Sequence, residues 1–345
     1  MLTELIKIEN TDEQEKDLHR AAEILRQGGL VVFPTETVYG LGGNGLDSEA
    51  AKKIYAAKGR PSDNPLIIHI AKPEDAARYA VPNDTYERLA KAFMPGPLTV
   101  ILPKRDCIPT TVTGGLDTVA VRCPSHPVAR RLIELAGIPI AAPSANLSGK
   151  PSPTSAAHVA QDMDGRVDMI LDGGDCEIGL ESTIVKLDGD RVTLLRPGGI
   201  TYDALCMVCE HVTVADAVIH QLAEGERPLS PGMKYRHYAP TAPVILLDGD
   251  ADRVLRFLQE AQATQKCAIL CYDEEIVFLK DDYLFPVGKR NDLATQAKRL
   301  FSALRRADTT DAETVYAHLP PMDGLGLALY NRMIRAAAHT VKRID

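Results

Sequence analysis

The stretch VVFPTETVYGLGGNGLDSEAAKKIYAAKGRPSDNPLIIHI, residues 31–70, decides the fold. It begins with a short apolar strand and continues through a polar loop, a run of glycines and an Ala/Lys-rich helix to a second apolar strand. Pro34 ends the first strand, because proline has no N–H to offer the ladder. The loop after it presents hydroxyl and carboxylate groups that could contact a small amino acid. Strands that alternate with helices in this way indicate an α/β or α+β domain with a mixed sheet.

The alternation continues through the first two hundred residues. Thr11 and Gln14 form a capping-box pattern ahead of an apolar stripe, and Gly28 is a suitable stop, so a helix is predicted over 12–27. A second helix is predicted over 48–57. The apolar segments predicted to be strands are residues 30–33, 66–70, 98–102, 119–122, 138–142, 169–171, 183–187 and 192–195.

Two domains are expected, because a chain of 345 residues is longer than most single hydrophobic cores can serve. Residues 1–207 are predicted to form the catalytic domain. The regular pattern lapses over 208–243, a proline-rich stretch that is interpreted as an ordered linker. Residues 244–345 repeat a strand–helix rhythm typical of a small Rossmann-like domain. Its predicted strands are 244–247, 268–272 and 315–319, and its predicted helices are 253–261, 293–307 and 325–338.

Composition narrows the class of protein. With 45% hydrophobic and 25% charged residues, the chain has enough apolar material for a substantial core. No apolar stretch approaches the ~20 residues of a membrane span, and the N-terminus has no signal-peptide pattern, so a cytoplasmic protein without a membrane partner is expected. A net charge of -8 disfavours broad electrostatic binding of nucleic acid, and no stable nucleic-acid binding is expected.

The seven cysteines predict neither disulfides nor a metal site. Their number is odd and they are scattered, so reduced thiols are expected. The pairs Cys206/Cys209 and Cys267/Cys271 superficially suggest zinc. They lie far apart and lack the residues that usually flank a zinc knuckle, so ordinary buried or surface thiols are the preferred interpretation.

The familiar nucleotide-binding motifs do not fit this chain. Gly40, Gly42 and Gly45 spell G-x-G-x-x-G, but in a dinucleotide fold those glycines follow the strand directly and open a helix. Here six residues separate them from the strand. The Walker pattern also fails, because Gly149-Lys150 is followed by proline. If the chain binds ATP, it does so without a P-loop.

Several polar clusters follow predicted strands. Each could bind a ligand, and each could instead serve only the fold. The loop 58–65 carries Lys58 and Arg60 between prolines and could hold phosphate oxygens, or it could be an exposed turn. His69 lies in an apolar strand, where a core role is more common than catalysis. Arg122 ends a strand and is costly to bury unless it meets an anion, for which a ligand carboxylate is a plausible partner.

Polar groups at strand ends also occur further along the chain, in the serine-rich turn after residue 142 and at Ser182 and Arg196, which lie near glycines. Hydroxyls and free backbone N–H groups in such turns can form an anion nest, although they also serve to cap helices. Because all these clusters fall within the first two hundred residues, one shared pocket is expected.

Taken together, PTETVYGLGG, KGRPSDNPLIIHI, APSANLSGKPSPT, GLESTIV and LLRPGG closely resemble the YrdC-like family. KYRHYAP and the C-terminal segment resemble its longer, two-domain, YwlC-type form. The resemblance covers essentially the whole chain. It implies a twisted, open, mixed-sheet α/β domain with a deep cleft, a linker that crosses this cleft, and a small Rossmann-like domain.

The resemblance also implies a nucleotidyltransferase activity. L-Threonine, bicarbonate and ATP, with Mg²⁺ accompanying the ATP, would give L-threonylcarbamoyl-AMP, pyrophosphate and water. A separate transferase complex would then pass the threonylcarbamoyl group to the tRNA adenosine beside the anticodon. No covalent nucleophile is expected, and residues 230–240 of the linker are the candidate for a cover that excludes water.

The resemblance assigns the site residues by motif. The implied catalytic residues, near the phosphates, are Lys58 and Arg60. The implied threonine-binding residues are Thr37, His69, Arg122, Ala142 (through its backbone) and Ser182. The implied ATP-binding residues are Arg60, Asn64, Thr118, Ser144, Ser152, Arg196 and, from the linker, Tyr238.

Two alternatives from other classes remain open at this point. YrdC-like domains carry a locally positive concave surface, so the chain could be an RNA-binding module. It could also be a carbamoyl-transfer domain of the hydrogenase-maturation type. Proteins of the second kind normally add acylphosphatase and zinc-finger segments, and neither is recognisable in this sequence.

Overall fold

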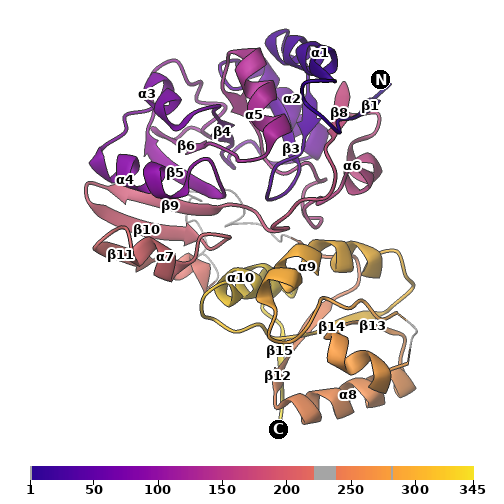
Figure 1. Cartoon of the computed structure of the whole chain (residues 1–345). Helices are drawn as coiled ribbons and strands as arrows, with labels where there is room; N and C mark the ends of the chain where they lie inside the picture. The colour runs from indigo at the N-terminus through magenta and orange to yellow at the C-terminus, as the bar shows by residue number, and fades with distance from the viewer. Residues whose placement is uncertain (1, 221–237, 281–282) are drawn as a thin grey trace. The chain divides into compact units, whose positions relative to one another are not determined.

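A computed structural model describes residues 2–220, 238–280 and 283–345 (Figure 1). The chain divides into two compact units. The described residues of the first unit are 2–148, 153–177 and 181–220. The second unit contains 238–280 and 283–345, together with two short segments from earlier in the chain, 149–152 and 178–180.

The described part of the first unit is built on an eleven-stranded mixed sheet with the order β1-β8-β2-β3-β7-β4-β6-β5-β9-β10-β11. Its strands are β1 Glu4–Lys7, β2 Val31–Phe33, β3 Gly40–Asn44, β4 Ile67–His69, β5 Leu98–Pro103, β6 Thr118–Arg122, β7 Ile140–Ala141, β8 Met169–Asp172, β9 Thr183–Asp188, β10 Arg191–Arg196 and β11 His211–Val214. Parallel pairs such as β4 with β6 lie beside antiparallel pairs such as β5 with β6. The predicted mixed-sheet α/β class is confirmed.

The helices of the first unit are α1 Glu15–Arg26, α2 Ser48–Lys58, α3 Ala76–Tyr79, α4 Asp84–Phe93, α5 Pro127–Ala136, α6 Ala156–Met163 and α7 Tyr202–Cys206, with short 3₁₀ turns η1 Pro73–Asp75 and η2 Asp216–Val218. The apolar stripe of α1 and the buried face of α5 pack against β2, β7 and β8 in one hydrophobic cluster. The strand residues in this cluster include Phe33 and Ile140. Helices α1 and α5 therefore cover the part of the sheet that β2, β7 and β8 form.

The start of α1 differs from the prediction. The helix begins at Glu15, and Gln14 at its N-cap makes no capping bond with its side chain. The Gln14 side-chain oxygen instead accepts the N–H groups of Glu9 and Asn10, at 3.0 and 2.9 Å. The predicted stop is correct, since Gly28 takes the left-handed conformation just after the helix, with φ +77°.

The glycine run at 40–45 forms a strand, β3, rather than a ligand loop. A Cβ atom on Gly42 would lie 2.8 Å from both the Phe33 ring and the Ile140 side chain. Glycine is therefore needed for the packing of neighbouring strands, and the rejection of a dinucleotide fingerprint at this run agrees with the structure.

The expected linker, 208–243, is only partly described. Its first part forms β11 and η2, and β11 pairs with β10 in parallel at the edge of the first sheet. Residues 221–237, which include most of the expected cover at 230–240, lie outside the described residues.

The described part of the second unit is a four-stranded parallel sheet with the order β13-β14-β12-β15. Its elements are β12 Val244–Gly249, α8 Ala251–Thr264, β13 Cys267–Leu270, η3 Asp273–Phe278, α9 Leu293–Ala307, β14 Thr314–His318, α10 Gly326–Ala336 and β15 Val341–Ile344. This agrees with the expected small Rossmann-like domain. In the described ranges of the chain, none of the helices has the length and apolar character to cross a bilayer.

Candidate functional site

Polar side chains from four strands lie in one row across the first sheet. The register pairs His69 of β4 with Arg122 of β6, and Arg122 with Thr99 of β5. Residues paired in this way point to the same face of a sheet. Ser182 directly precedes β9, and its hydroxyl oxygen is 2.8 Å from that of Thr99. The row therefore joins three predicted threonine-side residues, and it adds Thr99, which was not predicted.

An apolar floor lies beside this row on the same face. Ile67, Ala120 and Ile101 pair across β4, β6 and β5 two residues away from the row, and they form a buried cluster with residues of β9 and β10. Thr118, at the start of β6, comes two residues further on. Four residue steps of about 3.3 Å separate Thr118 from Arg122, roughly 13 Å in all. Thr118 thus lies beyond the floor, away from the polar row.

Arg122 already has an anionic partner within the protein. Its Nη2 donates to Oε1 of Glu36 at 2.6 Å, and both side chains are only 5% exposed. The other Glu36 oxygen accepts the Ser125 N–H at 3.2 Å. Nε of Arg122 is also buried, and it has no hydrogen-bond partner among the described residues. A ligand carboxylate is therefore not needed to compensate the buried Arg122 charge, and among the described residues the Nε N–H has no acceptor.

Thr37 belongs to the same loop as Glu36 and is fully buried. Its hydroxyl is 2.8 Å from that of Thr35, which also donates to the Val38 carbonyl at 2.6 Å. The Thr37 N–H donates back to the Thr35 oxygen at 3.2 Å. Thr35 therefore organises the loop on which Thr37 and Glu36 are presented.

His69 is neutral at physiological pH. Burial, followed by the nearby positive charge of Arg122, lowers the pKa of His69 to about 3. Its Nδ1 is 3.3 Å from the Ile140 carbonyl, which can only accept, so Nδ1 carries the hydrogen and Nε2 is left as an acceptor. The Phe33 ring meets the imidazole edge-on at 5.8 Å. A neutral, fixed ring of this kind suits ligand orientation better than proton transfer near pH 7.

The low pKa of His69 predicts a loss of stability in acid. Between the unfolded pKa near 6.5 and the folded value of about 3, only the unfolded chain binds the proton, so stability falls as pH falls. From pH 7 to pH 5 this group should remove about 2 kcal/mol from the free energy of unfolding. We expect His69→Gln to lose correspondingly less over that range in urea titrations. Equal losses in both proteins would contradict the assignment.

Arg196 and Ser182 are in direct contact, although the resemblance placed them on different sides. Arg196 donates through Nε to the Ser182 carbonyl at 3.0 Å and through Nη2 to the Ser182 hydroxyl at 3.2 Å. Arg196 therefore lies at the end of the polar row, where it can contact either substrate. The predicted threonine side and the predicted ATP side of the site therefore meet at Arg196 and Ser182.

Lys58 fastens the serine-rich turn to the end of α2. Its buried ammonium group donates to the carbonyl of Ser144 and, at 2.6 Å, to that of Asn146. The Ser144 hydroxyl donates to the Asn146 side-chain oxygen at 2.5 Å, and the Ser148 N–H donates to the Lys58 carbonyl at 2.9 Å. The predicted phosphate lysine thus holds the loop that carries Ser144.

Arg60 and Asn64 form the two ends of one tight loop. Nη2 of Arg60 donates to the carbonyls of Asn64 and Pro65, at 3.4 and 3.2 Å. The Tyr55 hydroxyl also donates to the Asn64 carbonyl, at 3.2 Å. The side-chain oxygen of Asn64 is buried and has no hydrogen-bond partner in the described part of the chain. The Arg60 and Asn64 side chains are therefore buried at the two ends of the loop, while Pro61 and Ser62 between them are exposed.

The remaining predicted residues are placed as follows. The Ala142 N–H donates to the Ile67 carbonyl at 2.8 Å, so this N–H is used within the sheet and is not free for a ligand. Ser152 and Tyr238 are buried and belong to the second unit. Tyr238 has φ +64° and stacks on Phe301, with ring centroids 5.2 Å apart. Their role on the ATP side stays a prediction.

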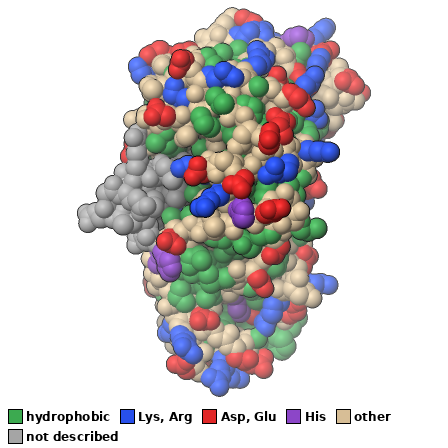
Figure 2. Space-filling view, turned by 90° about the vertical axis from the view of Figure 1, so that its left-hand side faces the viewer, with side chains coloured by type: hydrophobic (Ala, Val, Ile, Leu, Met, Phe, Trp, Pro, Cys, Tyr) green, Lys and Arg blue, Asp and Glu red, His purple; other side chains and the backbone are tan. Residues whose placement is uncertain are grey.

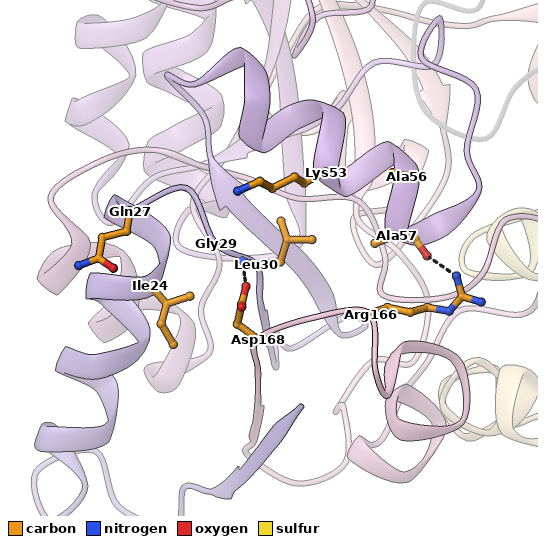
Figure 3. Close-up of a pocket in the computed structure, with 9 residues that line it drawn as sticks. All are labelled: Ile24, Gln27, Gly29, Leu30, Lys53, Ala56, Ala57, Arg166 and Asp168. Carbon is orange, nitrogen blue, oxygen red and sulfur yellow. Dashed lines mark hydrogen bonds between the residues drawn. The ribbon is translucent and has the colours of Figure 1, made fainter. Parts of the chain in front are cut away.

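A separate cavity of about 610 Å³ lies beside α1 and α2 (Figure 3). None of the predicted site residues lines it. Its charged side chains hold backbone groups: Lys53 donates to the Gly28 carbonyl at 2.7 Å, Arg166 donates to the Ala57 carbonyl at 3.4 Å, and Asp168 accepts the Leu30 N–H at 2.8 Å. These contacts explain the charges without a ligand.

Within the described ranges, no group of three or more His, Cys, Asp or Glu side chains is arranged to hold a metal ion. All seven cysteines are free thiols. On the face drawn in Figure 2, basic and acidic side chains are interspersed over the described surface rather than gathered by sign. The expectation of no stable nucleic-acid binding stays a prediction.

Comparisons with known proteins identify the family. Residues 23–198 match the family described as "Telomere recombination", and residues 200–338 match "Threonylcarbamoyl-AMP synthase, C-terminal domain". The threonylcarbamoyl-AMP synthase of Bacillus subtilis is 46% identical over 342 residues, which cover 97% of this chain and 98% of that protein. The chain belongs to the threonylcarbamoyl-AMP synthase family. The resemblance noted from the sequence motifs is thereby confirmed, including the two-domain form.

A relative and a solved structure from Pyrococcus abyssi agree over the full length, and E. coli YciO agrees over part of the chain. The protein of that name from Pyrococcus abyssi is 44% identical, covering 99% of this chain and 100% of its own. The crystal structure of P. abyssi Sua5 complexed with L-threonine matches with a TM-score of 0.91 at 43% identity, covering 100% of both chains. E. coli YciO matches 58% of this chain and 97% of its own with a TM-score of 0.52 at 26% identity. The prediction of an enzyme of nucleotidyltransferase type is confirmed.

Proposed function

We propose that this chain forms L-threonylcarbamoyl-AMP and pyrophosphate from L-threonine, bicarbonate and ATP. Membership of the synthase family supports the reaction. The observation in this chain that carries the proposal is the buried polar row of His69, Arg122 and Ser182, which ends at Arg196. The row offers fixed donors and acceptors of the kinds that a zwitterionic hydroxy-amino acid requires. An apolar floor beside it can support a larger ligand.

Threonine would lie on the polar row. The free Nε of Arg122 and the Ser182 hydroxyl can donate to its carboxylate, and Nε2 of His69 can accept from its hydroxyl or amine. Glu36 keeps Arg122 from being a lone buried charge before the substrate arrives. A binding site of this design is preformed, which reduces the ordering that binding would require.

ATP would approach with its phosphates near Lys58, Arg60 and Arg196. These cations offset the charge that accumulates when ATP, bicarbonate and a carboxylate meet. The ATP would arrive as its magnesium complex. Because the described residues contain no carboxylate cluster, the metal ion would keep phosphate and water as its main ligands, as Mg²⁺ commonly does. Bound Mg²⁺ would supply positive charge that offsets part of the phosphate charge.

The chemistry then needs positioning more than covalent catalysis. The threonine amine attacks the carbon of bicarbonate, and loss of water leaves a carbamate. A carbamate oxygen attacks the α-phosphorus of ATP, and pyrophosphate leaves. Holding three reactants in line at a buried, preorganised site is the contribution expected of the protein. The product would pass to a transferase complex that modifies the tRNA adenosine next to the anticodon.

The direct test of this proposal is pyrophosphate release by the purified full chain. With MgATP present, we expect release to require both L-threonine and bicarbonate, and ¹⁴C from labelled bicarbonate to appear in a nucleotide product. Omission of threonine provides the background rate. Pyrophosphate release at the same rate without threonine, or with no carbon incorporated, would refute the proposal.

A further inference from the structure

Helix α9 contacts two segments that come from much earlier in the sequence. Residues 149–152 and 178–180 belong to the second compact unit, together with α9 and α10. Both segments adjoin predicted substrate-binding residues. Ser152 ends the first segment, and Ser182 comes two residues after the second.

The first segment is held through its backbone carbonyls. Nη2 of Arg305, in the last turn of α9, donates to the Pro151 carbonyl at 2.7 Å. The Ala239 N–H donates to the Gly149 carbonyl at 3.1 Å. The Arg305 side chain is buried, so its charge-assisted hydrogen bond is protected from water. Such a bond fixes the peptide that immediately precedes Ser152.

The second segment touches the backbone of α9 itself. Gly179 has φ +79°, and a Cβ added to it would lie 2.5 Å from Cα of Lys298 and 2.7 Å from the Ala297 carbonyl oxygen. Helix backbone cannot move aside as a side chain can. The approach is therefore possible only for glycine, and it fixes the chain just before Glu181 and Ser182.

The chain around both segments is also anchored within the first unit. The Ser148 N–H donates to the Lys58 carbonyl, and the Pro153 carbonyl accepts the Tyr39 N–H, both at 2.9 Å. The Thr183 N–H donates to the Pro97 carbonyl at 2.9 Å. Only a few residues lie between these anchors and the contacts on α9, so a shift of α9 would be transmitted directly to Ser152 and Ser182.

We infer that α9 is a positioning element for both substrates, setting Ser152 for ATP through Arg305 and Ser182 for threonine through Gly179. This inference rests on the proposed function. It gives the C-terminal domain a specific role in the reaction, and it assigns Arg305 and Gly179 as positioning residues that do not themselves contact substrate.

The ATP arm of the test compares Arg305→Ala with Arg306→Ala in the full chain. Arg306 is the exposed neighbour of Arg305, with its guanidinium over the Phe285 ring, and so controls for the loss of a positive charge. We expect Arg305→Ala to weaken binding of a non-hydrolysable ATP analogue by about tenfold or more, with threonine affinity unchanged. Arg305→Lys should restore part of the loss, because lysine can still donate to the carbonyl. Arg306→Ala should match the wild type.

The threonine arm compares Gly179→Ala with Gly189→Ala. Gly189 also has a positive φ, +61°, but a Cβ added there would meet nothing within 4 Å. Both changes therefore carry the same backbone penalty, and only the first displaces the segment from α9. We expect Gly179→Ala to weaken threonine binding by about tenfold or more and Gly189→Ala to leave it unchanged.

The pattern across substrates separates positioning from general damage. Loss of ATP affinity alone in Arg305→Ala, and of threonine affinity alone in Gly179→Ala, would support the inference. Equal losses of both affinities in each variant, in step with a lowered melting temperature, would overturn it, as would wild-type affinities in both. Failure of the proposed function would be seen in the wild-type chain, which would then release no threonine-dependent pyrophosphate. Failure of the inference would be seen in the affinities of the variants, so the two results can be told apart.

Discussion

Arg122→Met is expected to lower the free energy of unfolding by about 3–5 kcal/mol and to abolish threonine binding. The reason is the buried Glu36 carboxylate, which would lose the guanidinium 2.6 Å away and, among the described residues, would keep the Ser125 N–H as its donor. A charge left without its counter-ion in a buried site is strongly destabilising, whereas methionine fills a similar volume. Urea unfolding and calorimetric titration with L-threonine measure the two effects separately.

A second variant separates stability from binding. The double substitution Arg122→Met with Glu36→Gln removes both charges, so most of the lost stability should return. Threonine binding should remain absent, because the donor to the substrate carboxylate is still missing. If the single variant were within 1 kcal/mol of the wild type, or if the double variant bound threonine normally, the role given to this ion pair would be wrong.

Lys58→Met should produce the second large effect. The ammonium group donates to two carbonyls of the serine-rich turn, those of Ser144 and Asn146. Each buried carbonyl left without a donor costs about 1–3 kcal/mol, so a loss of about 2–4 kcal/mol is expected. Release of the Ser144 loop, together with loss of a phosphate-side cation, should lower affinity for MgATP by at least about tenfold.

The matched control for Lys58 lies on the same helix. Lys52 is exposed and pairs with Glu49 three residues away, so Lys52→Met should change the free energy of unfolding by less than about 1 kcal/mol. ATP affinity should be unaffected. Similar behaviour of the two methionine variants in chemical unfolding would show that Lys58 does not fasten the loop.

The regular elements were largely predictable from hydrophobic periodicity. The predicted helix 293–307 coincides with α9, and the buried strands of the first sheet were placed to within one or two residues, β7 being shorter than expected. The errors have physical causes. β15 carries mostly exposed side chains and β3 is mostly glycine, so neither shows the apolar alternation that marks a strand. The start of α1 was misplaced because the Gln14 side chain caps an upstream turn instead.

The site was predictable in part. Motifs pointed to His69, Arg122 and Ser182, and strand register brings these three together. The pairing of Glu36 with Arg122 and the place of Thr99 were missed, because such contacts join segments that are distant in the sequence. One signal could have found Glu36: a buried arginine requires an anion, and this carboxylate stands in the polar loop after β2. The contact between Arg196 and Ser182 likewise depends on a strand pairing that spacing alone does not reveal.

The central claim is that threonine binds on the polar row at the ends of β4 and β6, with ATP extending from it over the apolar floor. The most direct measurement is a crystal structure of the full chain grown with L-threonine and a non-hydrolysable ATP analogue. We expect the threonine carboxylate within hydrogen-bond distance of Arg122 and Ser182, and phosphate oxygens near Lys58 and Arg60. Threonine bound away from Arg122, or Arg60 and Arg196 facing opposite sides of the sheet, would contradict it.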